Sequence, residues 1–502
     1  MRSKFYAVLF FMLPLFYLTA QTKTESLDKK INAVFEPIVN FFSIIIFFEP
    51  FAFLGFEMPF IVLWLIIGAV FFTVRFNFIN FTGVKHALEL IRGKYDDPNE
   101  PGEVSHFQAL VTALSGTVGL GNIAGVAVAV SLGGAGATFW MIVAGIIGMS
   151  SKFVECTLGV KYRKINEKGE VSGGPMYYLS EGLARKGFKN SGKVLAILFA
   201  LLCVGGSFGG GNMFQANQSF AQVVNIFPVF EGKGFWYGMV IAIFVGAVII
   251  GGIKKIASVT DKIVPFMVVI YVVSCLVIIG AEIHNLGSAF AQIWNGAFSP
   301  DGIAGGFMGV LIMGFRRAAF SNEAGVGSAA IAHSAVKTDE PISEGFVALL
   351  EPFIDTVIIC TMTALVLIFT GFAQDTNGLE GSALTSRAFS SVLPWFRYVL
   401  LVAIILFAFS TMISWSYYGM KAWTYLFGNN KFMENTYKIL FLIFTVIGAS
   451  SSLGVVMDFS DMMILAMAVP NIIGMYFLSG EVRKDLASYL RRLKSGEIKK
   501  YK

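Results

Sequence analysis

The sequence predicts an all-α polytopic membrane protein with about eleven spans: one extra N-terminal transmembrane helix, then two five-helix repeats of opposite orientation. The first supporting observation is composition. The 502 residues are 56% hydrophobic and only 14% charged, with a mean hydropathy of +0.71, whereas soluble domains carry about 25% charged residues. The second is a series of apolar segments of transmembrane length. The third is that two of these segments contain glycine clusters at matching positions.

The N-terminus resembles a secretory signal peptide over residues 1–20. Basic residues precede an apolar run, Phe5–Leu18, which is short for a span and ends at small residues. We expect cleavage near Ala20, with an uncleaved signal anchor as the alternative. Residues 21–55 form a polar and then interfacial segment, and residues 56–74 contain the extra transmembrane helix.

The remaining apolar segments form two groups of five, residues 107–281 and 303–478, followed by a basic cytoplasmic tail over residues 479–502. The eleven expected spans are Phe56–Val74, Phe107–Leu132, Thr138–Val160, Val194–Asn225, Trp236–Gly251, Ile263–Ala281, Ile303–His333, Gly345–Gly371, Tyr398–Tyr418, Ile439–Ser452 and Met462–Leu478.

The distribution of basic residues predicts the orientation. With the first span beginning outside, the loops and tail assigned to the cytoplasm hold 27 Lys and Arg, and the opposite loops hold three, Lys233, Arg387 and Arg397. This asymmetry is a strong positive-inside signal. We therefore expect a multi-pass protein of the cell (inner) membrane with its N-terminus outside and its C-terminus in the cytoplasm. The net charge of +6 belongs to these surface loops and does not indicate a nucleic-acid partner.

The first glycine cluster lies at Ser115–Gly125, SGTVGLGNIAG. Glycine costs about 1 kcal/mol relative to alanine in a helix, so the cluster favours unwound backbone. Unwound backbone at membrane depth is tolerated where it is buried in protein or lines a cavity, and such broken helices mark transporter binding sites. Close packing between helices is the alternative reason for small residues here.

The second cluster, Phe320–Ala332 or FSNEAGVGSAAIA, repeats this pattern about 206 residues later. Five spans lie from one broken helix to the next, so the second copy is inverted in the membrane. Half-helix N-termini suit a carboxylate, and unwound carbonyls suit an ammonium group. The predicted binding site therefore places an anionic ligand group at Gly119, Leu120 and Gly121. A cationic ligand group would face carbonyls near Phe320 and Ser321, and the side chain of Gln215.

Two further residues complete the predicted pocket. Thr411 and Trp415 lie one helical turn apart and share a face, so Trp415 is a candidate wall that limits side-chain size. Packing alone is the alternative for Trp415, and a tie between helices is the alternative for Gln215.

The sequence lacks the motifs typical of disulfide frameworks, metal sites and nucleotide-binding loops. The four cysteines fall inside expected spans, the four histidines lack ligand spacing, and no GxxxxGK[ST] loop is present. We expect no enzyme activity and no cofactor, and the sequence carries no signal of an oligomeric state. An ion channel is the rival function, because broken helices also build selectivity filters.

Five motifs together resemble the alanine or glycine:cation symporter family, over about Ile61 to Leu478. They are SGTVGLGNIAG, GGPMYYL at Gly173–Leu179, GNMFQAN at Gly211–Asn217, FSNEAGVGSAAIAH at Phe320–His333 and STMISWSYYG at Ser410–Gly419. The resemblance implies the leucine-transporter fold and sodium-driven uptake of a small neutral amino acid such as alanine or glycine, with sodium as coupling ion. Proton coupling, or serine or glutamine as substrate, stays open.

The resemblance also implies two places for sodium. One uses the carbonyls of Ser115, Val118 and Ala408 with the hydroxyl of Thr411. The other is formed by the Thr117 carbonyl, the Asn122 side-chain oxygen, Ser321 and Asp355. Met412 stands where distant relatives have a hydroxyl, which leaves one or two sodium ions possible.

Charges inside the expected spans are costly and imply a role. They include Arg316, Arg317, Glu323, Glu351 and Asp355. We expect Glu323 to pair with an arginine and brace the second break, with proton transport as the alternative.

Overall fold

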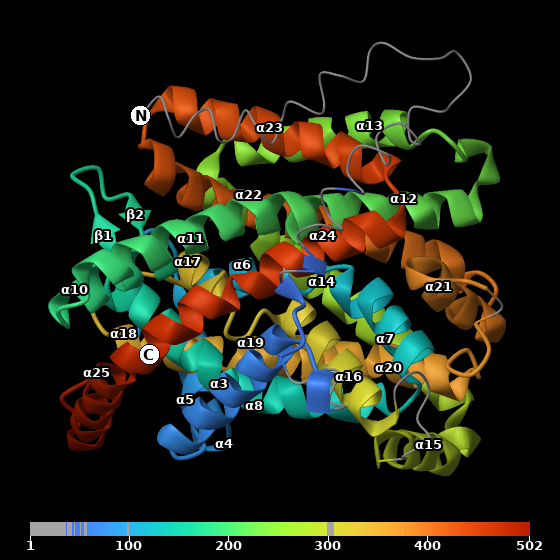
Figure 1. The fold of residues 1–502 in the computed structure, drawn as a ribbon, viewed down its shortest axis with the longest axis horizontal. Helices are drawn as coiled ribbons and strands as arrows, with labels where there is room; N and C mark the ends of the chain where they lie inside the picture. The colour runs from blue at the N-terminus through green and yellow to red at the C-terminus, as the bar shows by residue number, and fades with distance from the viewer. Residues whose placement is uncertain are drawn as a thin grey trace.

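The computed structural model describes residues 58–501 apart from 98–99, 299–305 and 377, together with residues 37, 43–44, 46–50 and 52–54. The expected signal peptide, and most of the segment 21–55, lie outside the described residues. The described chain is overwhelmingly helical and forms one bundle around two broken helices (Figure 1).

The first half of the chain holds the extra helix and the first repeat. Its elements are α3 (Phe60–Arg75), α4 (Ile79–Thr82), α5 (Val84–Ile91), α6 (His106–Thr117), α7 (Val126–Gly133), α8 (Ala137–Lys161), β1 (Lys164–Ile165), β2 (Val171–Ser172), α9 (Pro175–Tyr177), α10 (Leu183–Arg185), α11 (Lys189–Phe208), α12 (Phe214–Ile226), α13 (Gly234–Ile249) and α14 (Gly252–Ala281).

The second half holds the second repeat and the tail. Its helices are α15 (Leu286–Phe298), α16 (Gly306–Asn322), α17 (Ala329–His333), α18 (Pro341–Ala348), α19 (Leu350–Pro352), α20 (Thr361–Phe369), α21 (Gly381–Val392), α22 (Phe396–Phe427), α23 (Lys431–Ser450), α24 (Leu453–Ala466) and α25 (Ala468–Ser495). Short 3-10 helices cover Ala52–Leu54, Pro228–Phe230 and Ile283–Asn285, and π-helical turns cover Gly121–Gly125, Tyr178–Gly182, Gly209–Met213 and Phe353–Cys360.

Each of the eleven expected spans coincides with a helix or a broken pair of helices, but the count of eleven is not confirmed. Within the described residues, seven helical segments are long and apolar enough to cross a membrane, or eight if the pair α6 and α7 counts as one. The apolar helices α3 and α13 have 16 residues each and fall short of that length. The bent α6–α7 pair turns by 51° at its break.

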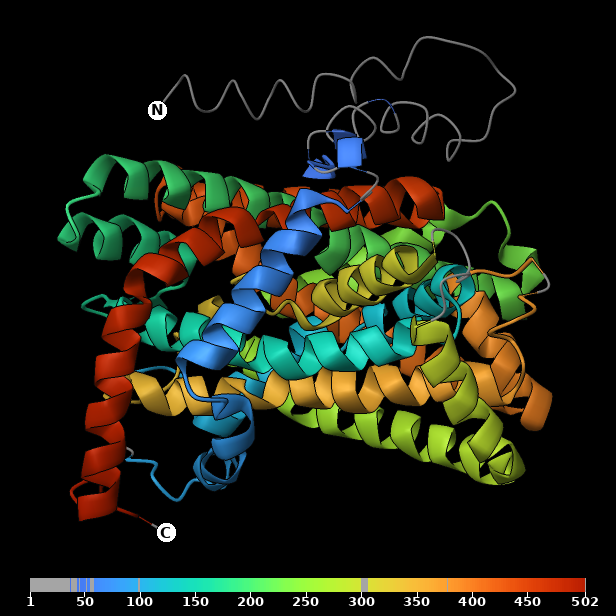
Figure 2. The same cartoon turned by 60° about the horizontal axis from the view of Figure 1, so that its bottom comes forward.

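The two broken segments lie at the centre of the bundle. α6 packs against α14 and α22, and α16 packs against α8 and α7. The extra helix α3 crosses over α8 diagonally (Figure 2). The loop after α8 forms the only strand pair of the described chain, with β1 and β2 antiparallel.

The expected tail begins inside α25, which runs without interruption from the bundle to Ser495. Its end is bound to other loops: Arg492 contacts both carboxylate oxygens of Glu340, at 2.5 and 2.7 Å. The Tyr501 hydroxyl donates to Asp97 Oδ2 at 2.7 Å.

Candidate substrate and cation site

The first break begins where α6 ends. A capping box between Ser105 and Gln108 starts this helix, and Thr117 is its last residue. The Gly119 N–H then donates to the Thr117 carbonyl and to Asn122 Oδ1, both at 2.9 Å. The Leu120 N–H donates to Gln215 Oε1 at 3.0 Å. Side-chain oxygens therefore satisfy the backbone amides that the unwound helix leaves free.

The second break begins three residues later than predicted. Phe320 and Ser321 belong to the last turn of α16, and the unwound backbone starts at Glu323, whose φ is 55°. The glycines at 325 and 327 also have positive φ, of 82° and 96°. The Ala324 N–H donates to Asn322 Oδ1 at 2.9 Å, so the helical bond to the Phe320 carbonyl is replaced. The asparagine side chain thus ends the helix at this point.

The two breaks meet around a small buried pocket. A Cβ added at Gly121 would lie 3.5 Å from both Phe320 Cδ1 and Ser321 Cα. The space open to the centre of a water molecule is about 10 Å³, about one water, so the pocket is nearly closed in this conformation. The lining residues are Gly116, Thr117, Gly121, Gly210, Gln215, Phe320, Glu323, Thr411, Trp415 and Ile464.

Five of the eight predicted substrate residues line this pocket, namely Gly121, Gln215, Phe320, Thr411 and Trp415. The other three contact the same cluster in different ways. The Leu120 N–H binds Gln215. A Cβ at Gly119 would overlap the Thr411 hydroxyl and lie 3.1 Å from Gln215 Oε1. The Ser321 hydroxyl points to Asp355 instead of into the pocket.

Gln215 connects the first break to a third irregular segment. Its oxygen accepts from Leu120, and its Nε2 donates to the Gly210 carbonyl at 2.9 Å, inside the π-helical turn Gly209–Met213. The sequence predicts that this side chain faces an ammonium group or ties helices together. In this conformation it ties two helices together while also lining the pocket.

The expected ion pair between Glu323 and an arginine is wrong. Glu323 accepts from Trp415 Nε1 at 3.0 Å and from the Ser328 hydroxyl. Arg316 and Arg317 both pair with Asp461 of α24 instead. The reason is geometric: Arg317 lies one turn before the end of α16 with its guanidinium 5.3 Å from the Phe320 ring centre, on the side of α24.

Four residues of the second predicted sodium group come from three separate segments. Asn122 Nδ2 donates to Asp355 Oδ1 at 2.6 Å, and the Ser321 hydroxyl donates to Asp355 Oδ2 at 2.9 Å. All three side chains are buried. The Thr117 carbonyl accepts from Gly119, whose N–H is also bound by Asn122. Asp355 is the residue that joins both breaks.

The first predicted sodium group is also assembled around α6 and α22. The Thr411 hydroxyl donates to the Ser115 carbonyl at 3.0 Å, and the Ser115 hydroxyl donates to the Ser410 carbonyl at 2.7 Å. Ala408 is buried within α22, and Val118 is buried directly after the last residue of α6.

Sequence reasoning missed several residues of the site. Gly116, Gly210 and Ile464 line the pocket, and Asp461 holds the two arginines of α16. Lys152 was overlooked although it lies inside an expected span and is fully buried, with Glu351 at 3.3 Å. The available signal for Lys152 was its charge within an expected span, whereas Asp461 lies directly before the expected span Met462–Leu478. The glycines and Ile464 carried no such signal.

Comparison with known proteins agrees with this architecture. Residues 46–502 match the sodium:alanine symporter family. The chain is 41% identical to the sodium/alanine symporter AgcS of Methanococcus maripaludis over 434 residues, which are 86% of this chain and 94% of that protein. It is 34% identical to the probable sodium/glutamine symporter GlnT of Bacillus subtilis over 439 residues, covering 87% and 89% of the two chains.

Among solved structures, the crystal structure of MhsT in complex with L-phenylalanine matches with a TM-score of 0.52. The match covers 74% of this chain and 89% of that chain at 15% identity, and it shows the fold. The leucine-transporter-type fold predicted from the sequence is therefore confirmed. The protein is a multi-pass membrane transporter of amino acids and not an enzyme. The chain belongs to the sodium:alanine symporter family.

Proposed function

We propose that the protein is a sodium-coupled symporter that imports a small neutral amino acid, alanine or glycine, by alternating access. The observation that carries the proposal is the Asp355 cluster. One carboxylate holds Asn122 from the first break and Ser321 from the end of α16, directly beside the pocket between the breaks. An ion bound there would alter both breaks at once.

The substrate is a zwitterion, and the pocket offers groups for both charges. The Leu120 N–H is bound by the Gln215 oxygen, and a carboxylate that displaces this oxygen would keep the hydrogen bond. The carbonyl end of α16 and the Glu323 carboxylate supply negative charge for the ammonium group. Trp415, Phe320 and Ile464 form the apolar walls of the pocket, and a small side chain would be admitted when these walls separate from the nearly closed arrangement.

Sodium would replace hydrogen bonds that the cluster makes in this conformation. Oxygens of Asp355, Asn122, Ser321 and the Thr117 carbonyl are hard ligands suited to such a cation. Thr411 with the carbonyls of Ser115, Val118 and Ala408 forms the second candidate set. The Thr411 hydroxyl also lines the pocket, so this second ion would contact the substrate site directly.

The energy of one sodium ion is sufficient for uptake. Its entry across 100 mV releases about 2.3 kcal/mol, and a tenfold concentration gradient adds about 1.4 kcal/mol. Together these support an accumulation of about 500-fold. We propose import into the cytoplasm, with the C-terminus on the cytoplasmic side, because of the 27 to 3 division of basic residues.

The test is uptake of radiolabelled alanine into proteoliposomes under sodium, proton or potassium gradients imposed separately. The sodium gradient alone should drive accumulation above equilibrium. Accumulation driven only by a proton gradient would replace the sodium proposal, and dissipation without accumulation would indicate a channel. Competition by unlabelled glycine, serine and glutamine in the same assay measures specificity.

A further inference from the structure

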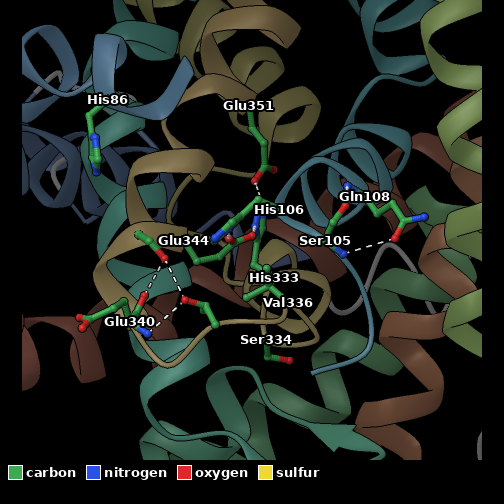
Figure 3. A network of polar contacts seen from close by, with 12 residues as sticks. His86, Ser105, His106, Gln108, His333, Ser334, Val336, Glu340, Glu344 and Glu351 are labelled. Atoms are coloured by element: carbon green, nitrogen blue, oxygen red, sulfur yellow. Dashed lines mark hydrogen bonds and ion pairs between the residues drawn. The ribbon is translucent and has the colours of Figure 1, made fainter. Parts of the chain in front are cut away.

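A second polar cluster lies away from the pocket, around His333 at the end of α17 (Figure 3). Its Nδ1 faces Glu344 Oε1 at 2.5 Å, and its Nε2 faces Glu351 Oε1. All three side chains are fully buried. The second oxygen of Glu344 contacts Nδ1 of His106, the first residue of α6. We call His333, Glu344 and Glu351 the histidine bridge.

The contacts of the bridge fix its proton content. A neutral imidazole has one N–H donor and one acceptor nitrogen, and an ionised carboxylate has acceptors only. Two carboxylates cannot both be bound by a neutral ring. Either the ring is an imidazolium with two donors, or one carboxyl group carries a proton. In both cases the bridge holds one proton more than a neutral histidine and two carboxylates.

The surrounding charges also favour that proton. On α8, Lys152 lies 3.3 Å from Glu351 Oε2 and 3.6 Å from Glu155 Oε1, and Cys156 lies close to His333 and Glu351. The Tyr418 phenol of α22 lies within electrostatic range of Glu351, and the Arg163 guanidinium, which donates to the carbonyls of Ser334 and Val336, lies within electrostatic range of Glu344. Glu323 at the second break lies within electrostatic range of Lys152. Lys152 alone therefore does not neutralise the buried carboxylates, and an uncompensated buried charge is costly.

We propose that the histidine bridge is a proton-binding site that holds α6 against α17 and α18 and so regulates opening of the pocket on that side. The bridge joins Glu344 to Glu351, and Glu344 in turn holds His106 at the start of the broken helix. Loss of the proton leaves an acceptor nitrogen facing a carboxylate, which repels the segments that the bridge joins. Opening of the transporter on this side is then linked to release of the proton.

The proposal rests on the transport activity of the family and not on the choice of alanine or sodium. It gives two expectations for the wild-type protein between pH 6 and 10. The rate of amino acid exchange rises with pH, by up to about tenfold per pH unit over the range in which the bridge loses its proton. The melting temperature of the purified protein falls over the same pH range. A proton that the bridge binds only in the folded protein stabilises the folded state at low pH, and this stabilisation is lost as the proton leaves.

Glu351→Gln is the discriminating variant. Its amide nitrogen would donate to His333 Nε2 and its oxygen would accept from Lys152, so the bridge forms without the extra proton. We expect its exchange rate and melting temperature to change little with pH. Glu155→Gln is the matched control: it removes one negative charge from the same lysine but does not touch His333. It should retain the wild-type pH step.

Glu344→Gln provides a second route if Glu351→Gln does not fold, since its amide would donate to His333 while its oxygen accepts from His106. A wild-type protein whose melting temperature and exchange rate are both flat across pH 6 to 10 would overturn the proposal. So would a pH step that survives in the glutamine variants of the bridge. The melting measurement needs no substrate, so its outcome is independent of whether alanine is transported.

Discussion

At the scale of single residues, amide side chains stabilise the unwound backbone. Asn122, Asn322 and Gln215 each accept a hydrogen bond from a main-chain N–H that a continuous helix would have satisfied. Each buried N–H left without a partner would cost about 1–3 kcal/mol. These side chains therefore let both helices be broken without a large penalty, and they place polar groups at the same point.

Asp355 is the residue on which sodium binding should depend most. In Asp355→Asn one oxygen is replaced by a donor that faces Asn122 or Ser321, both of which already donate. A charge-assisted bond contributes about 1.5–3 kcal/mol, so the sodium concentration for half-maximal uptake should rise about 10- to 100-fold. The measurement is uptake against sodium concentration.

Cys360→Ala is the matched control for this variant. The Cys360 thiol contacts both Asn122 and Ser321, at 3.3 and 3.4 Å, but offers no oxygen. For this variant the sodium concentration for half-maximal uptake should change less than about threefold, since a thiol is a weak acceptor. Equal effects of the two substitutions would indicate that the cluster acts by packing and not by binding the ion.

The residue types of the site were predictable from sequence, but their partners were not. Glycine clusters in apolar segments identify where a helix breaks, and this held for Gly119 and Gly327. The partner of Glu323 depends on which way the left-handed backbone at that residue turns, which only the folded chain determines. The end of α16 also depends on a side-chain contact of the folded chain. The helix extends to Asn322, later than the glycine pattern predicts.

At the scale of secondary structure, the two breaks differ in how they are held. The first bends by 51° and continues as a π-helical turn, Gly121–Gly125. The second passes through three residues with positive φ before α17 begins. Extra helices such as α15 and α21 were not expected, because they are short and amphipathic and lack the length of a span.

Alanine substitutions at two glycines of the first break should distinguish the effect of a steric clash from the effect of reduced backbone flexibility. Gly119→Ala places a methyl group against the Thr411 hydroxyl and 3.1 Å from Gln215 Oε1. Overpacking of this kind costs about 1–3 kcal/mol, so substrate affinity should fall about 5- to 100-fold. Gly125→Ala meets nothing within 4 Å and should keep wild-type affinity. Substrate binding by the purified variants measures both.

Glu323 should act as a brace for the second break. Its φ of 55° is unfavourable for a residue with a side chain, and it is held by bonds from Trp415 and Ser328. Glu323→Gln keeps an acceptor for Trp415 but loses the charge, a cost of about 1–2 kcal/mol. Uptake should fall about tenfold with the driving ion unchanged. A wild-type protein driven by protons together with a Glu323→Gln variant driven by sodium would show that Glu323 carries protons instead.

At the scale of the whole molecule, the C-terminal helix joins the core to the loops on one side. Arg492 of α25 binds Glu340, which precedes α18, and Tyr501 binds Asp97 in the loop before α6. α18 carries Glu344 of the histidine bridge and α6 carries His106. The docked end of the chain, the bridge and the start of the first broken helix therefore lie on one face, the one with most of the basic residues.

Labelling of introduced cysteines should determine which side that face occupies. The four native cysteines are buried, so their background reaction with a membrane-impermeant maleimide should be low. Ser495→Cys at the end of α25 is exposed, as is Glu231→Cys in the loop between α12 and α13 on the opposite face. Because basic loops are retained in the cytoplasm, the reagent should label the variant at 231 in intact cells. The variant at 495 should react only after the cells are permeabilised. The opposite pattern would reverse the proposed direction of the pocket's openings and assign the histidine bridge to the outer side, where its proton would come from the external medium.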